Sequence, residues 1–375
     1  MENWVKLCRG FLFLGSLVTI ATVCSQDGGL AARKKIYQGV AGFLEKYTDN
    51  ELEQFLKQGE AVNGSYGECK KIIVNGAEVF VKQVPLTDIE ALPENIRSTR
   101  NHFNLPTYYQ YGIGSAGFGV WRELEAHIMT TQWVLNGQCP YFPLLYHWRI
   151  LPLPKANPAT EEQKAWLDDT VIYWNNNSAV KKRIEDMFFA PKAVTLFIES
   201  IPERVDHWLE KEIAKGEVAG DIAIAQVFND LEKVTHFMQS QRFIHFDAHF
   251  KNILTDGKQL YLTDFGLAIS ADFALSVDEQ EFFEQHIMYD SCYIKAYTIL
   301  WLQKILFPNH DQKSLLEDYA QVEEFKIASP YVQQIFKKYA PFALVMNELE
   351  NKLRNESKLT PYPAGALERL SHELL

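Results

Sequence analysis

The segment HFDAHFKNILTDGKQLYLTDFG, residues 245–266, constrains the fold more than any other part of the chain. Two short runs, FKNILTD and QLYLTDF, lie on either side of Asp256-Gly257, a dipeptide typical of hairpin turns. If the runs pair as strands, Asn252 and Asp264 face one site. Mg²⁺ prefers oxygen ligands of this kind and keeps waters and phosphate oxygens in its shell. The hairpin therefore predicts a magnesium site.

A further carboxylate precedes the hairpin. Asp247 lies five residues before Asn252 in the run HFDAHFKN. Because Asn252 and Asp264 are assigned to the metal, Asp247 is free to orient or deprotonate a hydroxyl group. The segment thus combines a metal site with a candidate general base.

The predicted elements divide the chain into a β-rich front half and a helix-rich back half, joined near Ile201. The front half contains helices in YTDNELEQFLKQ and WRELEAHIMTTQWVL, strands in FPLLYHWRIL and AVTLFIES, and a hairpin in KKIIVNGAEVFVKQV around Asn75-Gly76. The back half contains apolar residues at helical spacing, namely Val227, Leu231, Val234 and Met238. This order predicts an α+β fold.

We divide the sequence into an apolar segment at 1–25, a front unit at 26–200 and a helical unit at 201–375. The front unit carries two predicted insertions, at 85–119 and 152–191. The first is irregular and punctuated by prolines, and the second is polar and partly helical.

Composition limits the classes of partner. Hydrophobic residues make up 47% of the 375 positions, which is enough to form a large core. The net charge of -11 argues against broad binding to nucleic acid, which needs a basic surface. The five cysteines are scattered, without the spacing of a zinc site or a disulfide framework. Residues 7–24 form an apolar run that is either a signal or anchor or a buried helix, so membrane contact is expected only there.

The segment at 245–266 resembles the protein-kinase-like superfamily, whose H-x-D-x-x-x-x-N and D-F-G motifs occur here in order. The resemblance covers about residues 60 to 300 and extends to bacterial kinase-like proteins. It implies a bilobal fold, with a small antiparallel β-sheet N-lobe and a mainly helical C-lobe. It also implies an ATP-dependent phosphotransferase, with Asp247 as catalytic base and with Asn252 and Asp264 on Mg²⁺.

The resemblance also implies a lysine that contacts the ATP phosphates. The run VFVK resembles the family's V-A-I-K and places Lys82 in that role. Upstream, VNGSYGE supplies Gly64 and Gly67, the last two glycines of the family's phosphate-covering loop. Val62 stands where the first glycine is expected, so this loop departs from the pattern.

A second glycine-rich stretch, GIGSAGFG at 112–119, follows Lys82 in the chain. Its order is wrong for the phosphate cover, and no alternating βα pattern supports a dinucleotide fold. Two interpretations stay open. The stretch is either a plain flexible turn or the start of the helix that carries the partner of Lys82, with glycines that allow the backbone to approach the cleft closely.

The helix that follows offers two partners for Lys82, namely Glu123 and Glu125. Because Glu125 shares a helical face with Trp121, Ile128 and Met129, we favour Glu125.

The later run VTLFIESIPE resembles the strand and hinge that hold adenine in the family. The resemblance implies that backbone groups near Glu199 and Ile201 contact the purine.

Departures from the family pattern leave the acceptor open. Phe246 replaces the usual arginine, and no A-P-E motif follows D-F-G, where Ser276 and Glu279 instead predict a helix start. His249 is typical of small-molecule kinases or is a structural imidazole, whereas Lys251 matches a phosphate-contacting cation of tyrosine kinases. We favour a protein Ser/Thr acceptor modestly over a small-molecule hydroxyl. A binding module with an inert cleft is the rival class.

The predicted location follows from the need for ATP. Asn63-Gly64-Ser65 is a glycosylation sequon within the predicted phosphate loop, and a glycan there would obstruct ATP. A cytoplasmic location is therefore favoured, with export or anchoring through the N-terminal segment as the alternative.

Overall fold

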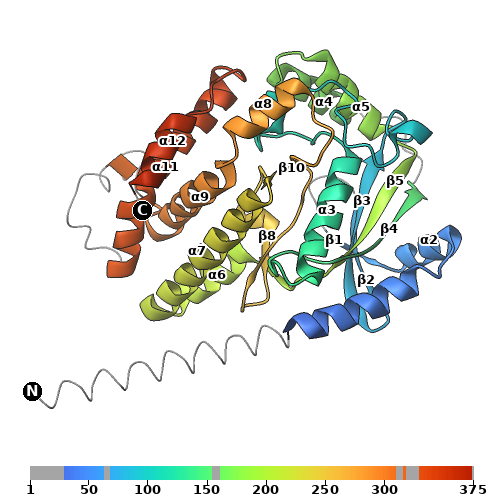
Figure 1. Cartoon of the computed structure of the whole chain (residues 1–375), viewed down its shortest axis with the longest axis horizontal. Helices are drawn as coiled ribbons and strands as arrows, with labels where there is room; N and C mark the ends of the chain where they lie inside the picture. Colours follow the sequence, from blue (N-terminus) through green and yellow to red (C-terminus); the bar gives the residue numbers. More distant parts are fainter. Residues whose placement is uncertain (1–28, 63–67, 154–160, 310–315, 318–328, 374–375) are drawn as a thin grey trace, which may run out of the picture.

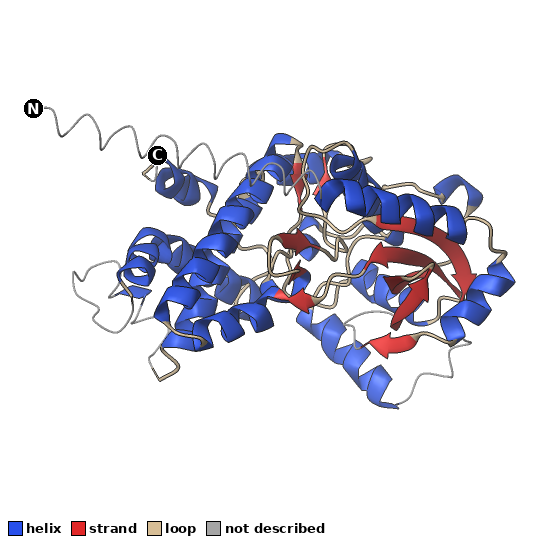
Figure 2. Ribbon diagram, turned by 90° about the horizontal axis from the view of Figure 1, so that it is seen from below, coloured by secondary structure: helices blue, strands red, loops and turns tan. Residues whose placement is uncertain are grey.

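The computed structural model describes residues 29–62, 68–153, 161–309, 316–317 and 329–373. Residues 1–25, for which a signal, an anchor or a buried helix was predicted, lie outside the described residues. The described chain combines a five-stranded antiparallel sheet and two smaller antiparallel sheets with a larger helical part, which is compatible with the predicted α+β class. Figure 2 shows the strands of this sheet on one side of the molecule and most helices of the back half on the other.

The main sheet has five strands in the order β1-β2-β3-β5-β4. They are β1 (Glu60–Val62), β2 (Glu68–Val74), β3 (Ala77–Leu86), β4 (Leu145–Pro152) and β5 (Lys192–Glu199). The predicted hairpin is confirmed, because Val74 pairs with Ala77 across the turn. Asn75 and Gly76 have φ values of 50° and 81°, as a two-residue turn with left-handed backbone requires.

Helices cover both faces of this sheet, and strand β3 shows how its side chains are divided. Val79 and Val81 belong to the same buried cluster as residues of a helix at 29–44 and of α2 (Asp49–Lys57). Val84 and Leu86 pack on the opposite face with α3 (Val120–Leu135). Because side chains alternate along a strand, Lys82 lies on the face toward α3. Figure 1 shows α3 beside the sheet.

The two predicted insertions have the expected character. Residues 85 and 86 are the end of β3, and residues 87–119 contain only two short 3-10 helices, η1 (Pro93–Asn95) and η2 (Thr107–Gln110), before α3 begins. The described part of 152–191 contains α4 (Glu161–Tyr173) and α5 (Ser178–Phe188). In Figure 1 these two helices are drawn in green at the top of the view, where α8 (Val277–Gln285) is drawn in orange.

The back half begins with β6 (Glu203–Arg204), α6 (Val205–Ala214) and α7 (Glu217–Ser240). The predicted apolar face of α7 is confirmed, since Val227, Leu231, Val234 and Met238 are fully buried. The helices α9 (Tyr289–Leu306), α11 (Pro330–Asn355) and α12 (Ala364–His372) complete this part. None of the helices in the described ranges is both long and apolar enough to cross a membrane.

Short strands and turns carry the motifs of residues 245–266. Strand β7 (Phe243–Ile244) pairs with β10 (Ile269–Ser270), and the turn η3 (Phe250–Asn252) leads into β8 (Ile253–Thr255). The predicted hairpin is confirmed, because β8 pairs antiparallel with β9 (Leu260–Leu262). The predicted start of α8 is confirmed too, by a capping box between Ser276 and Glu279.

Candidate active site

The centre of the candidate site is an ion-pair cluster around Lys82. Its Nζ atom lies 2.6 Å from Oε1 of Glu123 and 2.8 Å from Oδ1 of Asp264. These residues come from β3, from α3 and from the segment after β9. The side chain of Glu123 is 5% exposed, whereas that of Asp264 is 41% exposed. Asp264 therefore presents its carboxylate to solvent, while Lys82 binds it from the buried side and Glu123 holds Lys82.

The charges in this cluster stabilise one another. Burial alone would lower the pKa of Lys82, but the charges of Asp264 and Glu123 raise it above its usual value. Burial alone would raise the pKa of Asp264, but the adjacent ammonium lowers it to about 2. At neutral pH Asp264 is therefore an anion and Lys82 a cation, so the cluster offers both charge signs to a ligand.

The predicted pairing of Lys82 with Glu125 is wrong. The carboxylate of Glu125 instead binds Arg97 through two hydrogen bonds, of 2.6 and 2.9 Å. The prediction failed because it assumed that the more apolar side of α3 faces inward. Residues around the whole circumference of α3 are buried, including Glu123, His127 and Thr130, because the sheet covers one side and residues 85–119 cover another. Hydrophobic periodicity cannot identify the face toward Lys82 in such a helix.

Asp247 and Asn252 meet beside this cluster. The Nδ2 atom of Asn252 donates to Oδ2 of Asp247 at 2.9 Å and to the carbonyl oxygen of Asp247 at 3.1 Å. The backbone amide of Thr263 donates to the carbonyl of Asn252 at 3.0 Å, which fixes the turn η3 next to Asp264. The structure therefore brings together Asp247, Asn252 and Asp264, as the predicted hairpin requires.

The carboxyl group of Asp247 binds a proton more tightly than an ordinary aspartate. Burial raises its pKa well above the usual range, and repulsion from Asp264 adds to this effect. The hydrogen bond from Asn252 and the charge of Lys82 act in the opposite direction. A raised pKa suits a group that accepts a proton during a reaction.

Asp290 at the start of α9 positions the loop that carries Asp247. Its carboxylate accepts hydrogen bonds from the backbone amides of His245, at 2.6 Å, and Phe246, at 3.0 Å. Phe246 has a φ of 63°, which is unfavourable for an aromatic residue and needs such support. Sequence reasoning missed Asp290, although an aspartate in the otherwise uncharged run IMYDSCYI was a visible signal.

The stretch at 112–119, which we call the glycine loop, lies directly against the site. A Cβ atom on Gly112 would overlap the carboxylate of Asp247, and one on Gly117 would overlap the carbonyl oxygen of Gly266. Gly117 also has a φ of 78°, which favours glycine. The predicted close approach of this backbone to the cleft is confirmed.

A buried ion pair, also missed from the sequence, anchors the end of the glycine loop. Oε1 of Glu90 accepts a hydrogen bond of 2.9 Å from the amide of Val120, the first residue of α3. Oε2 of Glu90 lies 3.0 Å from Arg183 of α5, and both side chains are almost fully buried. The insertions at 85–119 and 152–191 thus hold the start of the helix that carries Glu123.

His249 and Lys251 have different surroundings. Nε2 of His249 lies 3.7 Å from Oδ1 of Asp247, and burial lowers the pKa of this imidazole. His249 is therefore neutral at pH 7 and close to the candidate base. Lys251 lies exposed on η3. Their predicted contacts with an acceptor or phosphate stay predictions.

The predicted purine-contacting segment contains a charged anchor. Glu199 ends β5, and its carboxylate binds Arg33 of the helix at 29–44 through contacts of 2.6 to 3.2 Å. Arg33 also donates to the carbonyls of Pro140 and Phe142. The amide of Glu199 donates to the carbonyl of Leu144 at 2.8 Å, so one of its two backbone groups is already paired. Ile201 follows two positions after Glu199, beyond Ser200.

The remaining predicted ligands are the two glycines of the phosphate-covering loop and the two residues assigned to Mg²⁺. Gly64 and Gly67 lie outside the described residues. Asn252 and Asp264 provide two oxygen donors, and nowhere in the described ranges do three or more His, Cys, Asp or Glu side chains form a metal-binding group. Asn252 uses its Nδ2 atom on Asp247, so its Oδ1 atom is the donor that could face a cation. Two protein ligands fit Mg²⁺ held mainly by phosphates and waters.

Comparison with models of known protein families gives no match, and none of the curated proteins compared with the chain matches it either. Functional inference therefore rests on the geometry of these residues.

Proposed function

We propose that the chain is an ATP-dependent phosphotransferase with a two-lobed, protein-kinase-like fold, acting on a hydroxyl acceptor. The observation that carries this proposal is the cluster of Lys82, Glu123 and Asp264 next to Asp247 and Asn252. A fixed cation, an exposed anionic metal ligand and a protonatable carboxylate in one cleft are what phosphoryl transfer needs from a protein.

Each residue has a separate role in the proposal. Lys82 binds phosphate oxygens, and Glu123 holds its ammonium in place. Asn252 and Asp264 would hold Mg²⁺, which supplies positive charge to the phosphates when it is bound. Asp247 orients the acceptor hydroxyl and accepts its proton. Positioning and charge neutralisation supply most of the rate in such reactions.

The five-stranded sheet and the helical part correspond to the two lobes of this proposal, with Glu199 and Ile201 in the connection between them. Backbone groups of this connection would contact the purine. The part-buried Arg33–Glu199 pair supports the assignment, because it fixes the end of β5, where the chain passes into this connection.

The rival function is nucleotide binding without turnover. The position of Asp247 beside Asn252 favours the active enzyme, because phosphoryl transfer to a hydroxyl needs a carboxylate at the acceptor, whereas nucleotide binding alone does not.

Calorimetric titration of ATP with and without Mg²⁺ tests the nucleotide part of this proposal. For the full chain we expect Mg²⁺ to strengthen ATP binding, and Asp264→Ala to abolish that gain. Glu125→Gln is the matched control, since this carboxylate binds Arg97 outside the cluster. Equal Mg²⁺ dependence in the wild type and in Asp264→Ala would contradict the metal assignment.

A further inference from the structure

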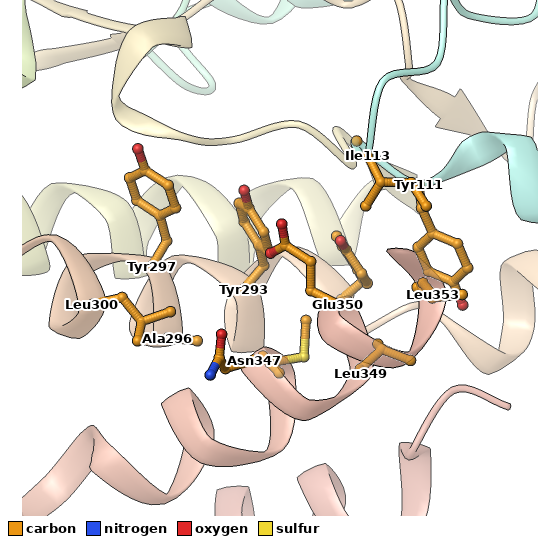
Figure 3. A pocket seen from close by; sticks show the side chains of 13 residues that line it. Tyr111, Ile113, Tyr293, Ala296, Tyr297, Leu300, Asn347, Leu349, Glu350 and Leu353 are labelled. Atoms are coloured by element: carbon orange, nitrogen blue, oxygen red, sulfur yellow. The ribbon is translucent and has the colours of Figure 1, made fainter. Parts of the chain in front are cut away.

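A small pocket lies between the start of the glycine loop and helices α9 and α11 (Figure 3). Tyr111, Gly112 and Ile113 line one side of it, and residues of the two helices, such as Tyr293 and Leu353, line the other. Its space for water-sized molecules is about 40 Å³, so it holds a few waters at most. Residues that border a cavity have fewer packing contacts on that side. Hydrogen bonds to neighbouring segments therefore matter more for the position of this part of the loop.

The residue after Gly112 is anchored by Tyr173, the last residue of α4. The hydroxyl of Tyr173 donates to the carbonyl oxygen of Ile113 at 2.9 Å. Burial raises the pKa of Tyr173, so this hydroxyl keeps its proton and remains a donor. The insertion at 152–191 thus holds the glycine loop immediately beside Gly112.

Lys358, in the segment after α11, holds the ring of Tyr173 in turn. Its Nζ atom lies 3.4 Å from the centre of that ring and 5.2 Å from the centre of the Trp174 ring. The same atom donates to the carbonyl oxygen of Leu353 at 2.8 Å. Burial lowers the pKa of Lys358 to about 8, so the side chain is a cation at pH 7 and is attracted to the aromatic faces. Tyr173 is thereby tied to the end of α11.

The residue before Gly112 has an anchor of its own. The hydroxyl of Tyr111 lies 2.6 Å from Nε2 of His286, at the end of α8. Nδ1 of His286 lies 2.7 Å from the carbonyl oxygen of Phe282, so Nδ1 carries the proton and Nε2 accepts from Tyr111. Burial lowers the pKa of His286 to about 4, which keeps the imidazole neutral at pH 7.

Gly112 therefore lies between two anchored neighbours, Tyr111 and Ile113. It is also the residue whose backbone borders the candidate base, because a Cβ atom at this position would overlap the carboxylate of Asp247. A displacement of either neighbour would move the backbone of Gly112 and change the space open to this carboxylate.

We propose that Tyr111 and Tyr173 are positioning residues for Asp247, and that Lys358 acts with them by holding Tyr173. They act through the backbone of Gly112. This inference rests on the proposed phosphotransferase function, because it assigns to these residues an effect on phosphoryl transfer. The binding of ATP itself depends on Lys82 and Asp264, which are held by their own ion pair.

Two variants remove one hydroxyl each and keep the ring, namely Tyr111→Phe and Tyr173→Phe. Their control is Tyr47→Phe in the front half, where the ring of Tyr47 contacts the rings of Phe43 and Phe55. Because the aromatic packing is kept in all three variants, a difference between them reports the two hydrogen bonds.

A third variant tests the support of Tyr173. Lys358→Met removes the charge and keeps an unbranched side chain in the buried position. Its control is Lys352→Met, because Lys352 is 42% exposed on α11 and pairs with Glu348 along the same helix.

Three quantities are measured on the full chain. Calorimetry gives the ATP affinity. Label transferred from γ-labelled ATP in the presence of Mg²⁺ gives the transfer rate, with a heat-treated lysate of cells that carry the gene as the source of acceptor. Hydrogen exchange of the backbone amides at 111–117, measured without nucleotide, tests the anchoring independently of any activity.

We expect Tyr111→Phe, Tyr173→Phe and Lys358→Met to lower the transfer rate roughly tenfold or more, with ATP affinity within about twofold of the wild type. Exchange at 111–117 should become faster in the same three variants, and both controls should behave as the wild type.

A wild-type transfer rate in these variants would overturn the positioning role, and unchanged exchange would overturn the anchoring. A loss of ATP affinity as large as the loss of transfer would also overturn the positioning role, because it would show a general structural effect. A wild-type chain that transfers no label would overturn the proposed function, while the exchange rates would still decide whether the anchors hold the loop.

Discussion

The backbone of Gly112 packs so closely against the carboxylate of Asp247 that a Cβ atom at position 112 would overlap it. Gly112→Ala would push the carboxylate of Asp247 away from the position that its bond with Asn252 defines. Because a shift of about 1 Å in a reacting group can cost about 100-fold in rate, we expect phosphoryl transfer to fall by roughly that factor. ATP binding should change little.

Gly114→Ala is the comparison for that variant. Its nearest neighbour is a ring atom of Tyr173, at 3.9 Å from the added Cβ, so the change does not reach Asp247. Gly114 has a φ of 111°, so alanine there should lower the stability without a matching loss of transfer. Equal kinetic effects of the two substitutions, measured as kcat with thermal unfolding as control, would refute the assigned contact.

The choice between two glutamates on α3 gives a second prediction. Glu123→Gln should lower kcat/KM for ATP by roughly 10- to 100-fold, because Lys82 loses the buried anion that positions it. Glu125→Gln should stay within about twofold, because its partner Arg97 is 49% exposed and exposed pairs contribute about 0–1 kcal/mol. Steady-state kinetics of both variants check this, and the opposite ranking would restore the rejected pairing.

Asp290 gives a prediction about stability. Asp290→Ala leaves the buried amides of His245 and Phe246 without an acceptor, which should lower the free energy of unfolding by about 2–6 kcal/mol. Asp290→Asn retains one acceptor oxygen and should lower the free energy of unfolding by less. Urea unfolding of both variants measures the difference. A loss below about 1 kcal/mol in Asp290→Ala would show that the loop holds its conformation by other contacts.

The pKa of Asp247 predicts how the rate depends on pH. A base works only when it is deprotonated, so kcat should rise with pH as Asp247 loses its proton. Because burial raises this pKa, the inflection should lie above the usual aspartate value of about 4. Rates at saturating ATP and Mg²⁺, with ATP affinity followed in parallel, check this. A rate that does not change with pH up to neutrality would argue against Asp247 as the base.

The parts of the fold governed by local sequence rules were predictable. Asn75-Gly76 sets the turn of the β2–β3 hairpin through backbone conformation alone, and the capping box at Ser276 acts within four residues. The buried face of α7 was predictable from the helical spacing of its apolar residues, because one side of this helix carries the buried residues. The residues of the site that belong to compact motifs, Asp247, Asn252 and Asp264, were also placed correctly beside one another.

Contacts between distant segments were not predictable. The Lys82–Glu123 pair depends on which side of α3 faces Lys82. Hydrophobic periodicity does not identify that side, because residues on several sides of α3 are buried. The Glu90–Arg183 and Arg33–Glu199 pairs join segments separated by 93 and 166 positions, and nothing local marks the partners. The glycine loop was recognised by its residues, but its contact with Asp247 arises only from the folded chain.

The central claim is that Asp247 promotes transfer of phosphate from ATP held by Lys82 and Asp264. Single-turnover transfer from γ-labelled ATP, compared for the wild type and Asp247→Asn at saturating nucleotide, tests this claim most directly. Asparagine keeps the shape of the side chain but cannot accept the proton. We predict near-normal ATP binding and a transfer rate reduced by roughly 10²–10⁴-fold. Transfer by Asp247→Asn at the wild-type rate would contradict the account.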